Sequence, residues 1–191
     1  MSAPLRVLRA DDHVRMAWAN GAGTTYQVMT SPEEADLASF DWRVSLADVE
    51  AGGPFSPFPG VDRILLLTDG TGMELTIDGR AQPLGRLDVA RFAGDSSTSA
   101  TLAAGPTRDL NVMTRRGRCS AELDLLAVAE QAGVAPAAGA TTLLVVVDGQ
   151  VRADEVRLWE RDVVVLDRPL VLRGTATVAR IRISPSPTGR E

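Results

Sequence analysis

The sequence contains no lysine, so all 20 of its basic residues are arginine. A chain without lysine cannot use a Walker A loop, a Schiff-base intermediate or any other mechanism that needs an amine side chain. Histidine, cysteine and tyrosine occur once each, at His13, Cys119 and Tyr26. These counts exclude a zinc finger, a multi-histidine metal site and an intramolecular disulfide. A catalytic triad would have to use His13, which lies outside any Gly-x-Ser-x-Gly context.

Long apolar runs are also missing. The longest, residues 143–147, has the length of a strand and is far shorter than the roughly 20 residues that span a bilayer. Residues 1–10 carry two arginines but no apolar segment, which argues against a secretory signal. A net charge of −5 disfavours nucleic acid and anionic membrane surfaces as partners. Together with the single cysteine, these features predict a cytoplasmic protein.

Short alternating segments dominate the remaining sequence. The chain has 191 residues, of which 45% are hydrophobic and 24% charged, the profile of a folded globular protein. Residues 40–46 and 73–77 alternate between apolar and polar, and residues 64–67 and 143–147 are continuously apolar, so each segment predicts a strand. Further strands are predicted at 86–92, 99–103, 109–113, 155–158, 162–166, 170–173 and 177–183. The pattern is typical of an all-β sandwich or barrel.

One or two short helices are expected beside the strands. Residues 121–131 favour a helix that Gly133 and Pro136 would end. A second helix is expected to start near Ser31, because Pro32 suits the first helical position and two acidic residues follow it.

A short internal repeat indicates two related halves. Residues 64–70 resemble residues 143–149, and each segment is followed by a strand pair and an Asp-Val step, at Asp88 and at Asp162. This order of a buried strand, a strand pair and an Asp-Val step is typical of a double-stranded β-helix. Two copies of it therefore predict a bicupin, that is, two RmlC-like jelly-roll barrels. We expect an N-terminal cupin-like barrel with the candidate pocket at 1–118, a C-terminal barrel packed as one unit with it at 119–185, and a disordered tail at 186–191.

Polar residues share one face of two predicted strands. Arg43 and Ser45 alternate with apolar neighbours, as do Asp109, Asn111 and Met113. If the apolar faces pack in a core, the polar faces line a cavity, in which the planar guanidinium of Arg43 could bind a carboxylate bidentately. The alternative is that Arg43 faces solvent and forms a surface ion pair.

Two loops add further candidates for a binding site. Trp18 and Asn20 combine an apolar wall with an amide, which suits a small polar ligand, while the glycines of residues 18–25 are predicted to form a turn. Residues 52–60 are stiffened by prolines, carry Phe55 and Phe58, and precede Arg63. Cupin metal sites use two or three histidines, and these strands contain none, so we expect neither a metal nor another cofactor.

Five ordered blocks of this sequence resemble the HutD/Ves family of bacterial metal-free bicupins. The blocks are Trp-Ala-Asn-Gly-Ala-Gly-Thr-Thr at 18–25, Phe-Asp-Trp-Arg-Val-Ser-Leu-Ala at 40–47, Gly-Pro-Phe-Ser-Pro-Phe-Pro-Gly-Val-Asp-Arg at 53–63, Phe-Ala-Gly-Asp at 92–95 and Asp-Leu-Asn-Val-Met at 109–113. The resemblance covers residues 5–185 and is looser beyond Arg118. It implies a pocket in the first barrel and a role in regulating histidine utilisation, by sensing urocanate or a formylated glutamate. The ligand-binding candidates that it implies are Trp18, Asn20, Thr25, Arg43, Ser45, Phe55, Ser56, Arg63, Asn111 and Met113.

The main hypothesis is therefore a protein that binds a small carboxylate-bearing metabolite, with Arg43 or Arg63 receiving the carboxylate. Arg63 has a second interpretation, an ion pair with Asp62, Asp41 or Asp109. One alternative function is a metal-free cupin isomerase or hydrolase that uses Asp109 or Glu74 as its base, with His13 and Tyr26 as the other acid-base candidates. Another is a protein-interaction module with a vestigial pocket. Barrel edges are also compatible with a homodimer.

Overall fold

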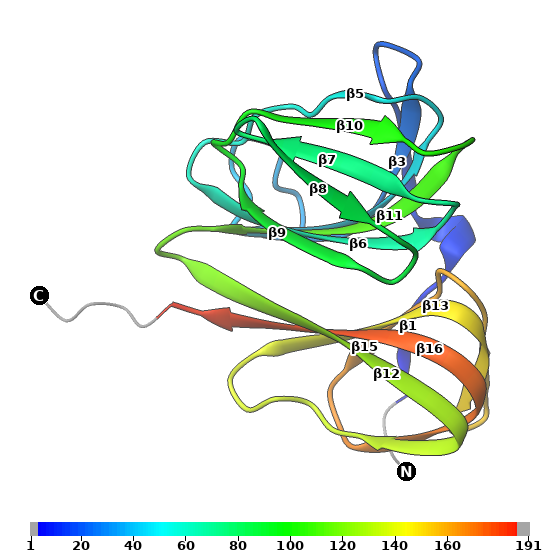
Figure 1. Cartoon of the computed structure of the whole chain (residues 1–191). Coiled ribbons are helices and arrows are strands. Elements are labelled where there is room, and N and C mark those ends of the chain that lie inside the picture. Colours follow the sequence, from blue (N-terminus) through cyan, green and yellow to red (C-terminus); the bar gives the residue numbers. More distant parts are fainter. Residues whose placement is uncertain (1–3, 187–191) are drawn as a thin grey trace, which may run out of the picture. The chain divides into compact units, whose positions relative to one another are not determined.

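Residues 4–186 are described by a computed structural model, and nearly all of their regular structure is β (Figure 1). Within this range there are sixteen strands and a single helix, the 3-10 turn Ala10–Asp12. No helix in these residues is long and apolar enough to cross a membrane. The described chain divides into two compact units, residues 14–120 and residues 4–13 with 121–186.

The unit formed by residues 14–120 contains two antiparallel sheets. In order across the first sheet, the strands are β2 (Val14–Ala17), β3 (Gly23–Ser31), β4 (Trp42–Val49), β11 (Thr107–Arg115), β6 (Val61–Asp69) and β9 (Val89–Ala93). The second sheet comprises β5 (Gly53–Pro54), β10 (Thr98–Leu102), β7 (Met73–Ile77) and β8 (Arg80–Leu84). Neither strand order closes on itself within residues 14–120, so both sheets are open.

A hydrophobic core joins these two sheets. Because alternate residues of a strand share a face, Leu65 and Leu67 of β6 point to the same side and pack with Met73 and Leu75 of β7. Phe92 of β9 belongs to the same cluster, and Trp18 and Phe55 pack against its margin.

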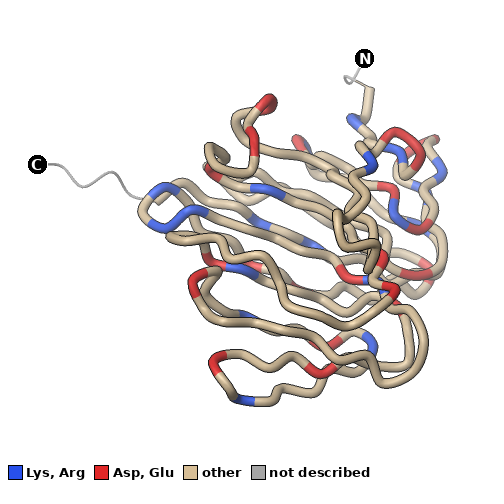
Figure 2. Tube along the Cα trace, turned by 90° about the horizontal axis from the view of Figure 1, so that it is seen from above, with Lys and Arg blue, Asp and Glu red and all other residues tan. Residues whose placement is uncertain are grey.

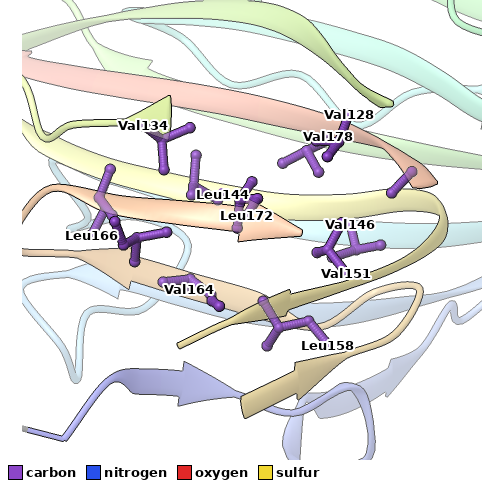
Figure 3. Close-up of a cluster of buried hydrophobic side chains, with 13 residues drawn as sticks. Val128, Val134, Leu144, Val146, Val151, Leu158, Val164, Leu166, Leu172 and Val178 are labelled. Atoms are coloured by element: carbon purple, nitrogen blue, oxygen red, sulfur yellow. The ribbon is translucent and has the colours of Figure 1, made fainter. Parts of the chain in front are cut away.

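The other unit is a single sheet with an aliphatic hydrophobic cluster. Its strands, in order, are β1 (Arg6–Leu8), β15 (Val163–Leu166), β13 (Thr141–Ala153), β16 (Leu170–Pro185) and β12 (Cys119–Val134), with β14 (Val156–Leu158) paired to β13. Figure 3 shows the buried cluster, in which every side chain is a valine, leucine or alanine. Thr142 and Asp162 are buried polar residues of the same unit.

The helix expected at 121–131 is wrong, because these residues form the middle of β12. Alanine, glutamate and leucine favour a helix locally, but the long antiparallel pairing in the sheet overrides that weak preference. The helix expected near Ser31 is also wrong. Ser31 is the last residue of β3, and a turn follows in which the Ala35 amide donates to the Pro32 carbonyl at 3.0 Å.

Two expected boundaries also differ from the structure. Residues 4–13 were assigned to the first barrel, but β1 pairs with β15, so they belong to the same unit as residues 121–186. The strands predicted at 170–173 and 177–183 are one continuous strand, β16. Except for Ser186, the tail predicted at 186–191 lies outside the described residues.

The internal repeat predicted from the sequence is present in the backbone. The strand order β4-β11-β6-β9 in one unit corresponds to β12-β16-β13-β15 in the other. The Leu67 amide donates to the Asp88 carbonyl at 3.1 Å, and the Val146 amide donates to the Asp162 carbonyl at 3.1 Å. The residue before each aspartate has a φ of 71°. Each repeat also skips one residue in the strand pairing directly after Leu67 or Val146.

Candidate functional site

A cavity of about 460 Å³ opens in the unit formed by residues 14–120. Its walls come from β3, β4, β11 and β6, from residues 16–20 and from residues 54–58. All ten residues that the resemblance implied as ligand-binding candidates line this one cavity. Asp109, Met16, Leu37 and Phe58 are among the further lining residues.

Strand register places the polar side chains of the cavity in rows. Met113 on β11 is the register partner of both Arg43 on β4 and Arg63 on β6. Asn111, which lies two residues before Met113 on β11, is the register partner of Ser45. Because residues i and i+2 share a face of a strand, both rows point to the same side of the sheet, which is the side of the cavity.

Arg63 is buried against three aromatic rings, which we call the phenylalanine cluster (Phe55, Phe58 and Phe92). The centre of its guanidinium lies 5.1, 5.6 and 5.0 Å from the three ring centroids, within the range of a cation–π interaction. Its Nε and Nη2 donate to Oδ1 of Asn111 at 3.4 and 3.3 Å. Burial lowers the pKa of Arg63 to about 10, so the side chain remains a cation at neutral pH.

Arg43 is also buried, with an exposed fraction of 6%. Its Nε donates to Oε1 of Gln27 at 3.1 Å, its Nη1 to Oγ of Ser45 at 3.4 Å, and its Nη2 to Sδ of Met16 at 3.9 Å. Burial lowers the pKa of this guanidinium as well. The interpretation of Arg43 as a surface residue in a solvent-exposed ion pair is therefore wrong.

Neither guanidinium has a carboxylate within ion-pairing distance among residues 4–186. Two of the aspartates considered for Arg63 pair elsewhere, Asp62 with Arg116 at 2.9 Å and Asp41 with Arg118 at 2.7 Å. Charges of both signs are interspersed along the chain trace (Figure 2), and the arginines that form ion pairs in residues 4–186 are all at least partly exposed. The cavity thus holds two buried cations whose hydrogen-bond and ring partners are neutral, although the charge of Asp109 acts on Arg63 and raises its pKa.

Asp109 is the one acidic residue among the lining residues of the cavity, and it is almost completely buried. Its Oδ1 accepts a hydrogen bond from Nδ2 of Asn111 at 3.3 Å. Burial raises the pKa of Asp109 to about 6, while the Asn111 hydrogen bond and the charge of Arg63 act in the opposite direction. Sequence reasoning placed Asp109 on the same strand face as Asn111 but did not include it among the pocket residues.

The loop of residues 18–25 shapes one wall of the cavity. Nε1 of Trp18 donates to Oγ1 of Thr25 at 2.8 Å, which fixes the orientation of the indole. Oδ1 of Asn20 accepts from the Ala22 amide at 3.0 Å, and the intervening Gly21 has a φ of 69°, so this segment forms the predicted turn. A Cβ on Gly23 would lie 2.5 Å from the Asp48 carbonyl oxygen and 3.1 Å from the Trp18 ring.

Met16 and Gln27, which contact Arg43, were missed by the sequence analysis because it did not predict β2 and β3. The strand β2 is short and fully exposed, so its alternation carries little signal. Phe58 was noted as an aromatic residue of its loop, but only the fold shows that it lies against Arg63. Within residues 4–186, no group of three or more His, Cys, Asp or Glu side chains could hold a metal ion.

Comparison with known sequences gives matches over most of this chain. The HutD family model matches residues 10–181. A 21.2 kDa protein of Pseudomonas putida, described by its position in the hutC 3′ region, is 41% identical over 120 residues, which are 62% of this chain and 63% of that protein. Protein Ves of Citrobacter koseri is 41% identical over 108 residues, or 56% of each chain. The matched region is therefore somewhat over half the length of these curated relatives.

Solved structures with the same fold cover nearly the whole chain. A conserved protein of unknown function from Pseudomonas aeruginosa PAO1 has 32% identity and a TM-score of 0.83, and the match covers 95% of this chain and 100% of that one. HutD from Pseudomonas fluorescens SBW25, in a formate condition, has 30% identity and a TM-score of 0.80 over 96% and 100% of the two chains. The bacterial pirin YhhW of Escherichia coli shares the fold, with a TM-score of 0.72 and 12% identity over 96% and 100% of the two chains. The expected cupin-like, all-β fold is confirmed, and the chain belongs to the HutD family.

Proposed function

We propose that this protein binds a small carboxylate-bearing metabolite in the cavity and thereby regulates histidine utilisation. The observation that carries the proposal is the pair of buried guanidiniums, Arg43 and Arg63, that face one cavity and have no carboxylate partner in the described chain. A buried charge is costly unless it is paired, so such a pair is best explained by an anion that arrives from outside.

Arginines with carboxylate partners lie on corresponding strand pairs of both units. Strand β16 of the other unit corresponds to β11, and two of its arginines, Arg180 and Arg182, have carboxylate partners on β12. Arg180 binds Asp124 at 2.7 Å, and this hydrogen bond raises the pKa of Arg180. In the unit with the cavity, Arg63 instead has a lowered pKa because it is buried. The corresponding strands β11 and β4 also carry an ion pair, between Arg108 and Asp48 at 2.6 Å. Arg43 and Arg63 differ from these paired arginines because they are buried and have no carboxylate within ion-pairing distance in residues 4–186.

The ligand candidates are urocanate and a formylated glutamate, both of which carry a carboxylate. The link to histidine utilisation is supported by the HutD family and by the relative in the hutC 3′ region. An arginine binds a carboxylate through two parallel N–H···O bonds, a geometry that lysine could not reproduce.

The test is a calorimetric titration of the purified protein with urocanate, N-formylglutamate, formate, histidine and glutamate. Saturable binding of one compound without turnover is expected. The Arg43→Ala variant should bind that compound at least about tenfold more weakly, because a hydrogen bond to a charged group contributes about 1.5–3 kcal/mol. Arg108→Ala is the matched control, since Arg108 lies on β11, pairs with Asp48 at 2.6 Å and is absent from the cavity lining.

Two results would contradict the proposal. Unchanged affinity in a folded Arg43→Ala variant would remove Arg43 from ligand binding. If no compound of the panel binds, the metabolite-binding function is overturned and a protein-interaction module is favoured instead.

A second candidate function is favoured by Asp109. A buried carboxyl with a pKa of about 6, on which the charge of Arg63 acts, has the properties of a general acid or base, as in a metal-free isomerase or hydrolase. Glu74, the other carboxylate considered as a base, is exposed on β7, and neither it, His13 nor Tyr26 lines the cavity. Turnover of a panel compound that is lost in Asp109→Asn would support this alternative over simple binding.

A further inference from the structure

We propose that Asp109 makes ligand binding depend on pH, because the cavity takes up a proton on this carboxylate together with the anionic ligand. This inference rests on the proposed carboxylate-binding function and adds a regulation of the same site. The position of Asp109, its link to Arg63 and the charge of the cavity lining support it.

Asp109 lies where the cavity meets the hydrophobic core between the two sheets. Its register partners are Ala47 on β4 and Leu67 on β6, and both belong to that core. Asp109 also lines the cavity, although only 2% of the residue is exposed. Water therefore has little access to the carboxylate, and nearby charges act on it more strongly than they would at the surface.

An amide side chain connects Asp109 to Arg63. Nδ2 of Asn111 donates to Oδ1 of Asp109 at 3.3 Å, and Oδ1 of Asn111 accepts from Nε and Nη2 of Arg63 at 3.4 and 3.3 Å. A ligand carboxylate that binds Arg63 would therefore share a small buried site with a second carboxylate. Two carboxylates in one such site disfavour each other's ionised form, so the ligand favours the protonated form of Asp109.

The charged groups around Asp109 come from three strands. Arg43 and Asp48 lie on β4, Arg63 lies on β6, and Arg108 lies on β11 itself, where it pairs with Asp48 at 2.6 Å. Burial has the largest effect on Asp109 and raises its pKa to about 6, while the charge of Arg63 lowers the pKa and that of Asp48 raises it. The carboxylate thus changes its charge close to neutral pH, and an anionic ligand acts in the same direction as burial.

Protonation of Asp109 changes the net charge of the cavity lining. Arg43 and Arg63 contribute two positive charges, and ionised Asp109 contributes one negative charge. The lining segments 16–20 and 54–58 contain no charged residue. The lining therefore carries +1 with ionised Asp109 and +2 with protonated Asp109. An anion is held more strongly in the second state, and by linkage its binding must raise the pKa of Asp109.

Linkage also gives the size of the effect. A rise in the pKa of Asp109 by about one unit, from about 6 to about 7, is a modest shift for two like charges in one site. The dissociation constant would then increase about sevenfold between pH 5.5 and pH 8. Binding near pH 6.5 would take up about half a proton per ligand.

The experiment is a calorimetric titration of the purified protein with N-formylglutamate and with formate at pH 5.5, 6.5 and 8. The carboxyl groups of both probes are almost fully ionised at these pH values, so the pH acts on the protein. Each titration is repeated in two buffers with different heats of ionisation, which gives the number of protons taken up. The wild-type protein should bind about five- to tenfold more tightly at pH 5.5 than at pH 8 and should take up about half a proton at pH 6.5.

Two variants test whether Asp109 receives the proton. Asp109→Asn imitates the protonated carboxyl, so it should bind each probe with the same affinity at pH 5.5 and pH 8 and take up no proton. His13→Gln is the matched control, because His13 is the only histidine of the sequence and does not line the cavity. This control should retain the pH dependence of the wild-type protein.

The outcomes separate this inference from the proposed function. Equal affinity of the wild-type protein at pH 5.5 and pH 8, without proton uptake, would overturn the inference and leave carboxylate binding intact. A pH dependence that Asp109→Asn keeps, or that His13→Gln loses, would also overturn it. If neither probe binds at any pH, the inference is overturned, whereas the proposed function is overturned only if no compound of its panel binds. The wild-type and His13→Gln titrations decide the question even if Asp109→Asn does not fold.

Discussion

Replacing Asp109 by asparagine should stabilise the protein, and the gain should grow with pH. Asp109 is almost completely buried, and its Oδ1 accepts a hydrogen bond from Nδ2 of Asn111 at 3.3 Å. Asparagine has nearly the same shape and can accept the same hydrogen bond through its Oδ1. The substitution therefore imitates the protonated carboxyl and removes the cost of burying a negative charge.

The size of the effect follows from the pKa of Asp109, which burial raises from 3.8 to about 6. Between these two values the folded protein binds more protons than the unfolded chain, so the wild-type protein loses stability as the pH rises. One pKa unit corresponds to 1.36 kcal/mol, so the loss is up to about 3 kcal/mol. It is absent below about pH 4 and complete above about pH 7. The variant should therefore match the wild type near pH 4 and exceed it by about 1–3 kcal/mol at pH 8.

Urea unfolding of both proteins at pH 4.5, 6 and 8 measures this difference. Asp48→Asn is a suitable control, since Asp48 is partly exposed and forms an ordinary ion pair with Arg108, so its loss should not stabilise the protein at pH 8. If Asp109→Asn were less stable than the wild type at pH 8, the ionised carboxylate would be a stabilising partner of Arg63. The view of the cavity as a site with an uncompensated charge would then be wrong.

Two further substitutions test the local structure around the cavity and the repeat. Gly23→Ala should weaken ligand binding severalfold, because a Cβ would lie 2.5 Å from the Asp48 carbonyl oxygen and 3.1 Å from the Trp18 ring. Unchanged affinity would show that the cavity wall formed by residues 18–25 does not contact the ligand. Asp162→Ala should lower the free energy of unfolding by about 2–4 kcal/mol, because the buried carboxylate accepts from Arg9 at 2.6 Å and from two backbone amides. The side chain of Asp88, its counterpart in the repeat, accepts a hydrogen bond from one backbone amide, so Asp88→Ala should lower the free energy of unfolding by only about 0.5–1.5 kcal/mol in the same urea assay. Equal losses in the two variants would contradict this reasoning.

The sequence predicted the cavity better than it predicted the strands around it. Alternation correctly placed Arg43 with Ser45 on one face of the strand at residues 40–46, and Asn111 with Asp109 and Met113 on one face of the strand at 109–113, because that periodicity is a direct consequence of strand geometry. The helix at 121–131 was wrong because local propensity competed with pairing to a strand some 50 residues away in sequence, which no local pattern records. The phenylalanine cluster around Arg63 combines a loop with two strands, so it too depends on contacts that only the folded chain reveals.

The internal repeat shows that the fold itself does not require a charged residue where Asp109 lies. Leu67 and Val146 are equivalent, because each directly precedes the one residue that the strand pairing skips in its repeat. The register partner of Leu67 is Asp109, and that of Val146 is Val178. Val178 is fully buried in the aliphatic core of its unit. One copy of the architecture thus fills this position with a valine, while the other keeps a buried aspartate in the cavity that Arg43 and Arg63 also line. A protein under selection for stability alone would favour the valine, because each buried unpaired charge reduces the free energy of unfolding. The polar residues of the cavity are therefore best explained by a ligand that they bind.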